Sequence, residues 1–313
     1  MNKKTLNTAD TQRLRKPDWL KIKLGGNLQY GHTRNIIRGH ALHTICASGK
    51  CPNQNECWSR GTASFMIAGD ICTRRCRFCN TKSGCPLPLD HNEPQKIAES
   101  IKALGLKHAV ITSVDRDDLP DGGSSHWRAT LEAIHALTPE VTVEVLIPDF
   151  RGNLEAVDRI IAAQPEVVAH NMETVRRLTP QVRHVATYDG SLAVLAHIAS
   201  RGVPTKTGIM LGLGETEDEI LELFDDLLLR GVSIITIGQY LQPTRQHLPV
   251  VEYITPEHFA HLKETAISKG FKHVESGPLV RSSYHAEEHF NGYCNSQGTP
   301  CAKKKISLIE LSR

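Results

Sequence analysis

Short apolar runs rich in β-branched residues recur along the chain after residue 60. Each run is almost continuously apolar, which is typical of a strand that is buried on both faces of a parallel sheet. The pattern therefore predicts six strands, at residues 63–68, 108–114, 141–147, 166–169, 205–211 and 232–237.

Longer stretches with the period of an amphipathic helix separate these runs. In the clearest of them, Thr216 and Glu219 form a capping box ahead of an apolar face, and Gly231 follows as a stop. Another begins at Pro256, because proline is favoured at the first position of a helix. The predicted helices cover residues 94–104, 124–137, 154–163, 191–200, 217–230 and 256–270.

Regular alternation of strands and helices predicts an α/β fold with a parallel sheet that is covered by helices. Six such units favour a partial (β/α)6 barrel of the TIM type, although spacing alone leaves an open sheet possible. No G-x-G-x-x-G follows the first strand, which counts against a dinucleotide-binding domain. We expect a loop-rich N-terminal extension at 1–60, the barrel at 61–275, and a C-terminal extension at 276–313.

Polar side chains follow several of the predicted strands. The carboxyl ends of parallel strands meet at one edge of the sheet, where the sites of such folds assemble. Any one of these residues could instead be an ordinary helix cap or turn former. The residues are Thr112, Ser113, Asp115, Asp149, His170, Asn171, Glu173 and Gln239.

The net charge of the 313 residues is only +3, and no run is long and apolar enough to span a membrane. The basic N-terminal segment lacks the apolar core of a secretory signal, so we expect a cytoplasmic protein. Nucleic acid is not an expected partner, since it needs a concentrated basic face. Basic side chains could steer an acidic partner or belong to a disordered arm; they are Lys3, Lys4, Arg13, Arg15, Lys16, Lys21 and Lys23.

Nine cysteines are present, and six of them lie between residues 46 and 79. A disulfide scaffold would be small and secreted, whereas clustered thiols in a reducing compartment more often bind metals. Cys85, Cys294 and Cys301 lie outside this group, and we expect them to be free thiols.

Cys72, Cys76 and Cys79, here called the downstream triad, form a C-x3-C-x2-C run just after the first predicted strand. Three thiolates on one loop can bind three irons of a four-iron cluster and leave the fourth iron open to an external ligand. A zinc site is the alternative, but it needs a second ligand pair and none follows at zinc spacing. The arginines between the thiols, Arg74 among them, suit an anionic cluster or are ordinary surface charge.

Cys46, Cys51 and Cys57, here called the upstream triad, form a second run with the pattern C-x4-C-x5-C. One such run alone would be a moderate indication of a metal site. Two runs that are separated by little more than the first strand predict two iron–sulfur clusters.

The downstream triad, with Phe78 before its last cysteine, resembles the signature of the radical S-adenosylmethionine (SAM) enzymes. Both triads together resemble the lipoyl synthase family within that superfamily. No motif position departs from the family pattern. The match extends over most of the chain, to motifs at residues 16–21, 56–58, 113–123, 144–149, 170–174, 206–215, 238–243 and 277–284.

The resemblance implies an enzyme that inserts sulfur at C6 and C8 of a protein-bound octanoyl group to make the lipoyl cofactor. The implied cofactors are two 4Fe–4S clusters, with SAM as co-substrate. The downstream triad would be catalytic, as the ligands of the cluster that binds SAM. The upstream triad would hold an auxiliary cluster that donates sulfur. Its implied fourth ligand, also catalytic, is Ser283 of the Arg-Ser-Ser-Tyr motif, with Ser282 as a close alternative.

The resemblance also implies contacts to SAM from the carboxyl ends of the strands. Phe78 would pack beside the adenine, and Asn171 and Glu173 would bind the ribose hydroxyls and the methionyl group. Glycines allow close backbone approach because they lack a Cβ, although tight strand–helix packing explains them equally well. The remaining implied contacts are Gly208, Gly212, Thr112 and Gln239.

The implied partners are octanoylated lipoyl carrier domains, namely the E2 subunits of 2-oxoacid dehydrogenases and the H protein of glycine cleavage. A reductant such as ferredoxin or flavodoxin and an iron–sulfur carrier for cluster rebuilding are implied as well. One alternative is another sulfur-inserting radical SAM enzyme with an auxiliary cluster. A second alternative is an electron-transfer or zinc-dependent binding module without catalysis.

Overall fold

An eight-stranded sheet forms the centre of the molecule in the computed structural model, which describes residues 14–22 and 25–296. Seven neighbouring strands are parallel, and β1 pairs antiparallel with β2 at one edge. In order across the sheet, the strands are β1 (His43–Thr44), β2 (Ser64–Ile67), β5 (His108–Ser113), β6 (Thr142–Leu146), β7 (Val167–Ala169), β8 (Thr205–Leu211), β9 (Ile234–Gln239) and β10 (His273–Gly277).

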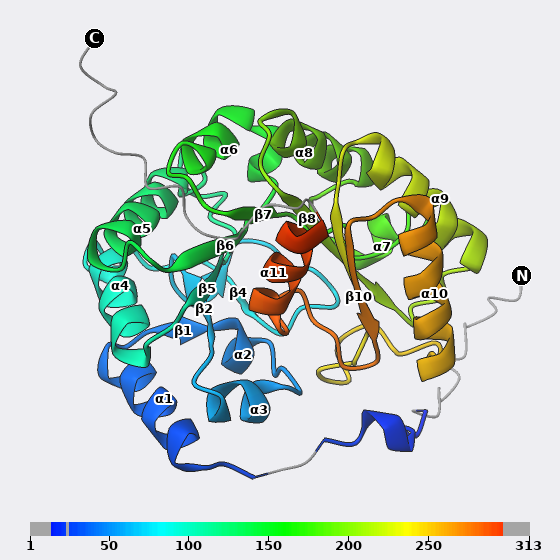
Figure 1. Cartoon of the computed structure of the whole chain (residues 1–313), viewed down its shortest axis with the longest axis horizontal. Helices are drawn as coiled ribbons and strands as arrows, with labels where there is room; N and C mark the ends of the chain where they lie inside the picture. Colours follow the sequence, from blue (N-terminus) through cyan, green and yellow to red (C-terminus); the bar gives the residue numbers. More distant parts are fainter. Residues whose placement is uncertain (1–13, 23–24, 297–313) are drawn as a thin grey trace, which may run out of the picture.

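Helices form an outer ring around the curved sheet (Figure 1). Each of the principal ones follows a strand, as the alternating pattern predicts. Within the described residues, no helix has both the length and the apolar character needed to cross a membrane. The ring contains α4 (Glu93–Leu104), α5 (Ser124–Leu137), α6 (Leu154–Ile161), α8 (Tyr188–Ser200), α9 (Glu217–Leu229) and α10 (Pro256–Lys269), and the smaller elements are η1 (Asp18–Leu20), β3 (Ile71–Cys72), β4 (Lys82–Ser83), η2 (Phe150–Gly152) and α7 (Thr179–Val182).

The predicted α/β partial barrel is confirmed, and its six strands appear where the apolar runs place them. The capping box at the start of α9 is present too. The Thr216 hydroxyl accepts a hydrogen bond from the Glu219 N–H at 3.4 Å, and a Glu219 carboxylate oxygen accepts one from the Thr216 N–H at 2.9 Å. Local patterning therefore determines these elements.

The sheet contains two strands beyond the six that the sequence predicts, β1 at one edge and β10 at the other. β10 pairs in parallel with β9 over residues 273–277, so the barrel continues slightly past residue 275. Helix α11 (Ala286–Ser296) follows in the C-terminal extension and packs Phe290 and Cys294 against Val167 and Ile234. Cys294 is disulfide-bonded, so the expectation of a free thiol there is wrong. Cys85 is free and exposed, and Cys301 lies outside the described residues.

The N-terminal extension is more regular than the loop-rich segment that we expected. Three helices precede β2, namely α1 (Leu28–Gly39), α2 (Ile45–Ser48) and α3 (Gln54–Ser59). Helix α1 packs against α3 and also against α4 of the barrel's helical ring. Tertiary packing rather than propensity therefore stabilises these helices.

A buried ion pair lies inside the barrel. The Lys206 ammonium on β8 donates to both carboxylate oxygens of Glu144 on β6, at 2.8 and 2.9 Å, and both side chains are about 1% exposed. Val143 and Val145 pack in the core with the helices, so the alternation of a strand directs Glu144 to the interior.

Replacing Glu144 with alanine is expected to lower the free energy of unfolding by about 3–5 kcal/mol, because it leaves a buried ammonium without its counter-charge. Denaturant unfolding of the two proteins measures the difference. Glu132→Ala on the surface of α5 is the matched control, since Glu132 pairs with Arg128 where both side chains are more than half exposed. It should change stability by less than about 1 kcal/mol. Equal effects of the two substitutions would contradict the prediction.

Candidate functional site

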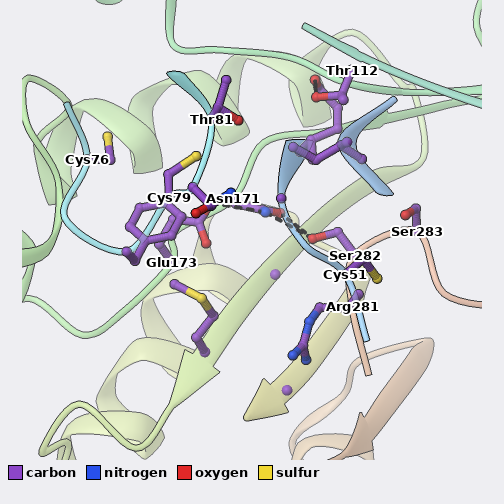
Figure 2. Close-up of a pocket in the computed structure, with 18 of the residues that line it drawn as sticks. Cys51, Cys76, Cys79, Thr81, Thr112, Asn171, Glu173, Arg281, Ser282 and Ser283 are labelled. Atoms are coloured by element: carbon purple, nitrogen blue, oxygen red, sulfur yellow. Dashed lines mark hydrogen bonds between the residues drawn. The ribbon is translucent and has the colours of Figure 1, made fainter. Parts of the chain in front are cut away.

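A cavity of about 350 Å³ lies at the carboxyl ends of the parallel strands. All three thiols of the downstream triad line it, and so do Cys46 and Cys51 of the upstream triad. Figure 2 shows Cys76 and Cys79 on one side of Asn171, and Cys51 with Ser282 and Ser283 on the other. The fold thus brings both predicted cluster sites to a single space.

The downstream triad lies on the loop that follows β2, at the open edge of the sheet. Burial raises the pKa of the Cys72 thiol to about 12, and the nearby Asp115 carboxylate adds to the shift. Burial also raises the pKa of Cys76, to about 11. Burial thus favours the neutral form of these thiols, and binding of a cluster would release their protons.

Arg74 anchors the downstream triad's loop to the ends of two strands. Its side chain is only 3% exposed and forms ion pairs with Asp115, Asp117 and Asp149, at 3.2, 2.8 and 2.7 Å. The sequence suggested a counter-charge for a cluster or ordinary surface charge at this position. The structure shows instead that carboxylates from the loops after β5 and β6 already neutralise this arginine, so its main effect is to fix the loop.

The upstream triad comes from the N-terminal helices. Cys46 lies on α2, Cys57 lies on α3, and Cys51 lies in the turn between them. Burial, together with the charges of Cys46 and Cys51, raises the pKa of the Cys57 thiol to about 12. All three cysteines line one cavity of about 80 Å³, as the ligands of a single cluster must lie around one volume.

The donor sets fit iron–sulfur clusters. Among the described residues, no three His, Cys, Asp or Glu side chains gather tightly enough to hold a single metal ion. In a cluster, each thiolate binds a different iron, so the thiolates surround a volume instead of a point. Both triads border cavities, and each triad supplies three soft sulfur donors that suit iron and sulfide.

The C-terminal extension brings the Arg-Ser-Ser-Tyr motif to the upstream triad. Asn53, at the start of α3, donates from its side-chain amide to the Leu279 carbonyl at 2.7 Å. On the other side, the Val280 carbonyl lies against Gly238 of β9, where an added Cβ would approach it to 2.2 Å. The segment is therefore held between the barrel and the N-terminal helices.

The two serines of this motif have different surroundings. The Ser282 hydroxyl accepts a hydrogen bond from the Asn171 side-chain amide at 3.0 Å, which turns it toward the barrel (Figure 2). Ser283 borders the 350 Å³ cavity and also a second cavity, which Cys46, Cys51 and Cys57 line. Ser283 therefore shares a cavity with all three cysteines of the upstream triad, and Ser282 does not.

Four of the residues implied for SAM border the same cavity, namely Phe78, Asn171, Glu173 and Gly208. The Asn171 amide donates to the Glu173 carboxylate at 3.2 Å. Burial raises the pKa of the Glu173 carboxyl, so a bound donor or cation would restore its charge. A Cβ on Gly208 would come within 2.9 Å of the Asn171 side-chain oxygen, so the lack of a side chain keeps this corner open.

Three other residues implied for SAM, namely Gly212, Gln239 and Thr112, are less well placed to contact it. Gly212 does not line the cavity, and its Cβ would meet the side-chain nitrogen of Gln239 at 2.2 Å, so packing explains this glycine. Gln239 borders the cavity, but its side-chain amide donates to the Leu211 and Glu252 carbonyls and accepts from the Ile254 N–H. It therefore acts as a structural clamp between β9 and the loop after it.

Thr112 and His170 also border the cavity with their polar atoms engaged. The Thr112 hydroxyl donates to the Leu146 carbonyl at 3.1 Å. The His170 ring contacts the Ile147 carbonyl and the Ser191 hydroxyl, and burial lowers its pKa to about 4. His170 is thus a neutral core histidine, which agrees with its omission from the predicted contacts.

Sequence reasoning missed Arg281, Arg183 and Gly238. Burial raises the pKa of the Cys51 thiol, and the positive charge of Arg281 opposes that shift. Arg183 donates to the Asn171 carbonyl at 3.0 Å and to the Ser191 hydroxyl at 2.7 Å. Arg281 and Gly238 belong to two of the motifs that carry the family resemblance. Membership of those motifs could therefore have identified them as candidate site residues.

Replacing Gly238 with alanine is expected to displace residues 280–283 and to weaken the auxiliary site. The new Cβ would lie 2.2 Å from the Val280 carbonyl oxygen. Relieving this clash requires the backbone of β9 and the backbone at Val280 to move apart, which displaces the segment. Overpacking of this kind costs about 1–3 kcal/mol. Iron analysis after anaerobic reconstitution should show partial loss of the auxiliary cluster. Gly39→Ala is the control, because an added Cβ there meets no atom within 4 Å; an unchanged iron content in Gly238→Ala would refute the prediction.

A model of the radical SAM superfamily matches residues 66–227, which is half of the chain. A lipoyl synthase from Parabacteroides distasonis is 66% identical over 89% of this chain and 99% of its own length. One from Bacteroides fragilis is 62% identical over 90% of this chain and 98% of its length, and one from Treponema denticola is 59% identical over 88% and 95%.

Solved structures show the same fold at low sequence identity. Methylornithine synthase (PylB) matches with a TM-score of 0.53 and 11% identity, over 83% of this chain and 86% of its own. Streptococcus suis SuiB bound to S-adenosylmethionine matches with a TM-score of 0.56 and 12% identity, over 72% of this chain and 55% of that one. The chain belongs to the lipoyl synthase family of the radical SAM superfamily, whose cofactors are two 4Fe–4S clusters and SAM.

Proposed function

We propose that this protein inserts two sulfur atoms, at C6 and C8, into an octanoyl group carried on a lysine of a lipoyl carrier domain. The observation that carries the proposal is the single cavity that the downstream triad shares with Cys46 and Cys51 of the upstream triad. A chain of saturated carbons placed there would lie between the site that binds SAM and the site that stores sulfur.

The cluster of the downstream triad and SAM, when bound, supply the means to remove hydrogen from saturated carbon, and the auxiliary cluster supplies sulfur. The residues of the chain position the reactants and exclude water. Apolar side chains of the cavity suit an octanoyl chain because it gains from leaving water. They include Ile45, Val114, Leu146, Ile147, Met210, Leu241 and Val280.

Phe78, Asn171, Glu173 and Gly208 are the proposed SAM contacts. Phe78 packs with the apolar core at the cavity wall, so its ring is held in place beside a bound adenine. Arg183 fixes the backbone at Asn171, and the Asn171 amide in turn orients the Glu173 carboxylate. These contacts hold the polar groups in position before SAM arrives, which lowers the entropy cost of binding.

Ser283 is the proposed fourth ligand of the auxiliary cluster. An oxygen ligand is harder than a thiolate and binds a soft iron–sulfide site more weakly. A cluster that must give up sulfur benefits from a ligand that can leave. The three thiolates of the upstream triad then keep the remaining iron in place.

The proposed carriers are E2 subunits of 2-oxoacid dehydrogenases and the glycine cleavage H protein. Ferredoxin or flavodoxin is the proposed reductant, and an iron–sulfur carrier protein would rebuild the auxiliary cluster. These partners imply a cytoplasmic location. Exposed Arg15, Lys16 and Lys21 near the N-terminus could attract acidic carriers by mild charge steering; Lys3, Lys4, Arg13 and Lys23 lie outside the described residues.

The direct test gives the reconstituted protein an octanoylated carrier domain or an octanoyl-lysyl peptide, with SAM and a reductant. Mass spectrometry should detect the gain of two sulfur atoms, and a peptide with an unmodified lysine is the control. Octanoyl substrate that stays unchanged while SAM is cleaved normally would point to a different sulfur acceptor.

A further inference from the structure

The upstream triad borders a second, smaller cavity of about 80 Å³ on its outer side. Cys57 lines this outer cavity but not the larger one, whereas Cys46, Cys51 and Ser283 line both. The auxiliary site is therefore accessible from two directions. One direction leads to the space for SAM and substrate, and the other leads outward past Arg60.

Contacts between half-buried and exposed side chains lie at the outer cavity; together we call them the latch. The Tyr284 hydroxyl donates to the two Glu56 carboxylate oxygens at 3.1 and 3.2 Å. Arg60 contacts the His285 ring at 2.7 Å and the Glu288 carboxylate at 3.4 Å. The latch thus joins α3, which carries Cys57, to the segment that carries Ser283.

The latch is weaker than the contacts on the inner side of the same segment. The side chains of Glu56 and Arg60 are 51% exposed and that of Glu288 is 61% exposed, so water screens their charges. On the inner side, Asn53 donates to the Leu279 carbonyl, and the Val280 carbonyl is packed against Gly238. When the segment moves, residues 284–288 therefore separate from α3 before residues 279–280 leave β9.

We propose that the outer cavity is the route by which iron and sulfide enter and leave the auxiliary site, and that the latch controls this route. The inference rests on the proposed function, in which the cluster is consumed and must be replaced. Bound SAM and an octanoyl chain would fill the larger cavity, so replacement through that side would have to wait until both had left.

Release through this route is ligand exchange without electron transfer. The bonds from iron to the three Sγ atoms and to the Ser283 oxygen break, and bonds from iron to an external ligand form. The thiolates, the alkoxide and the bridging sulfides take up protons from water, and the sulfides leave as hydrosulfide.

The test uses the full-length reconstituted protein and compares Glu56→Gln and Tyr284→Phe with the unaltered chain. Each variant should transfer auxiliary iron to a chelator about two- to fivefold faster, the effect expected for losing one exposed charged contact. Reloading with ferric iron, sulfide and dithiothreitol should also become faster. Glu132→Gln on α5 is the matched control and should change neither rate.

Two outcomes would overturn the proposal. If the latch variants released iron faster but reloaded more slowly or incompletely, Glu56 and Tyr284 would only stabilise the site. If SAM with an octanoyl-lysyl peptide, without reductant, blocked release of auxiliary iron, the route would run through the larger cavity. SAM cleavage in the same samples reports the other cluster, and failure of the proposed function would appear separately, as absence of sulfur insertion by the unaltered protein.

Discussion

Replacing Cys76 with alanine is expected to abolish reductive cleavage of SAM and to lower bound iron from about eight to about four atoms per chain. The segment after β2 offers three thiols to the cavity, and each of them would bind one iron of the cluster. Two remaining thiolates leave two irons without a protein ligand, so the cluster is lost on reconstitution. Anaerobic iron and sulfide analysis, with quantification of 5′-deoxyadenosine, measures both effects.

Cys85→Ala is the matched control for this experiment. Cys85 is a free, exposed thiol six residues beyond Cys79, and it does not line the cavity. It should keep about eight irons and normal SAM cleavage. Full cleavage of SAM by Cys76→Ala would contradict the assignment of the downstream triad, and zinc bound in place of iron would contradict the cluster interpretation itself.

Replacing Ser283 with alanine is expected to abolish sulfur insertion while SAM cleavage continues. The substitution removes the proposed oxygen ligand, which lines a cavity with the upstream triad, and leaves the downstream triad untouched. The auxiliary cluster should then bind only three protein ligands and lose iron readily. The octanoyl substrate should remain unchanged by mass spectrometry, whereas 5′-deoxyadenosine still forms.

Ser282→Ala separates the roles of the two adjacent serines. Ser282 bonds to Asn171 in the proposed SAM site, so its loss should weaken SAM binding several-fold and spare the auxiliary cluster. Equilibrium binding of SAM to the reconstituted protein measures this effect. Loss of the auxiliary cluster in Ser282→Ala, with retention in Ser283→Ala, would reverse the assignment.

Much of the fold could be predicted because its elements depend on local patterns. The strand β8 and helix α9 follow from an apolar run and from a capping box at Thr216. By contrast, β10 is a short strand with a mostly half-buried face, so its sequence lacks the continuous apolar run that identified the others. Helix α1 was missed because its place in the fold depends on packing against α3 and α4, and α4 is distant from it in the sequence.

Part of the candidate site could likewise be predicted from local patterns in the sequence, and part of it could not. Spacing alone grouped the six motif cysteines into two triads, because thiols a few residues apart on one loop must lie close together. It could not exclude Gly212 or Gln239 as SAM contacts. Their environment depends on Glu252 and Ile254, which a separate loop brings to them.

By itself, the sequence determined that the chain has two cluster sites on a parallel α/β barrel, since both follow from short-range spacing and periodicity. Only the tertiary structure decided that the two triads share one cavity, and that Ser283 rather than Ser282 faces the upstream triad. This arrangement depends on contacts such as the hydrogen bond from Asn53 to the Leu279 carbonyl, which joins residues that are 226 positions apart in the chain. Contacts at such separation form only when the whole barrel has folded, because no local pattern encodes which distant segment will lie beside the two triads.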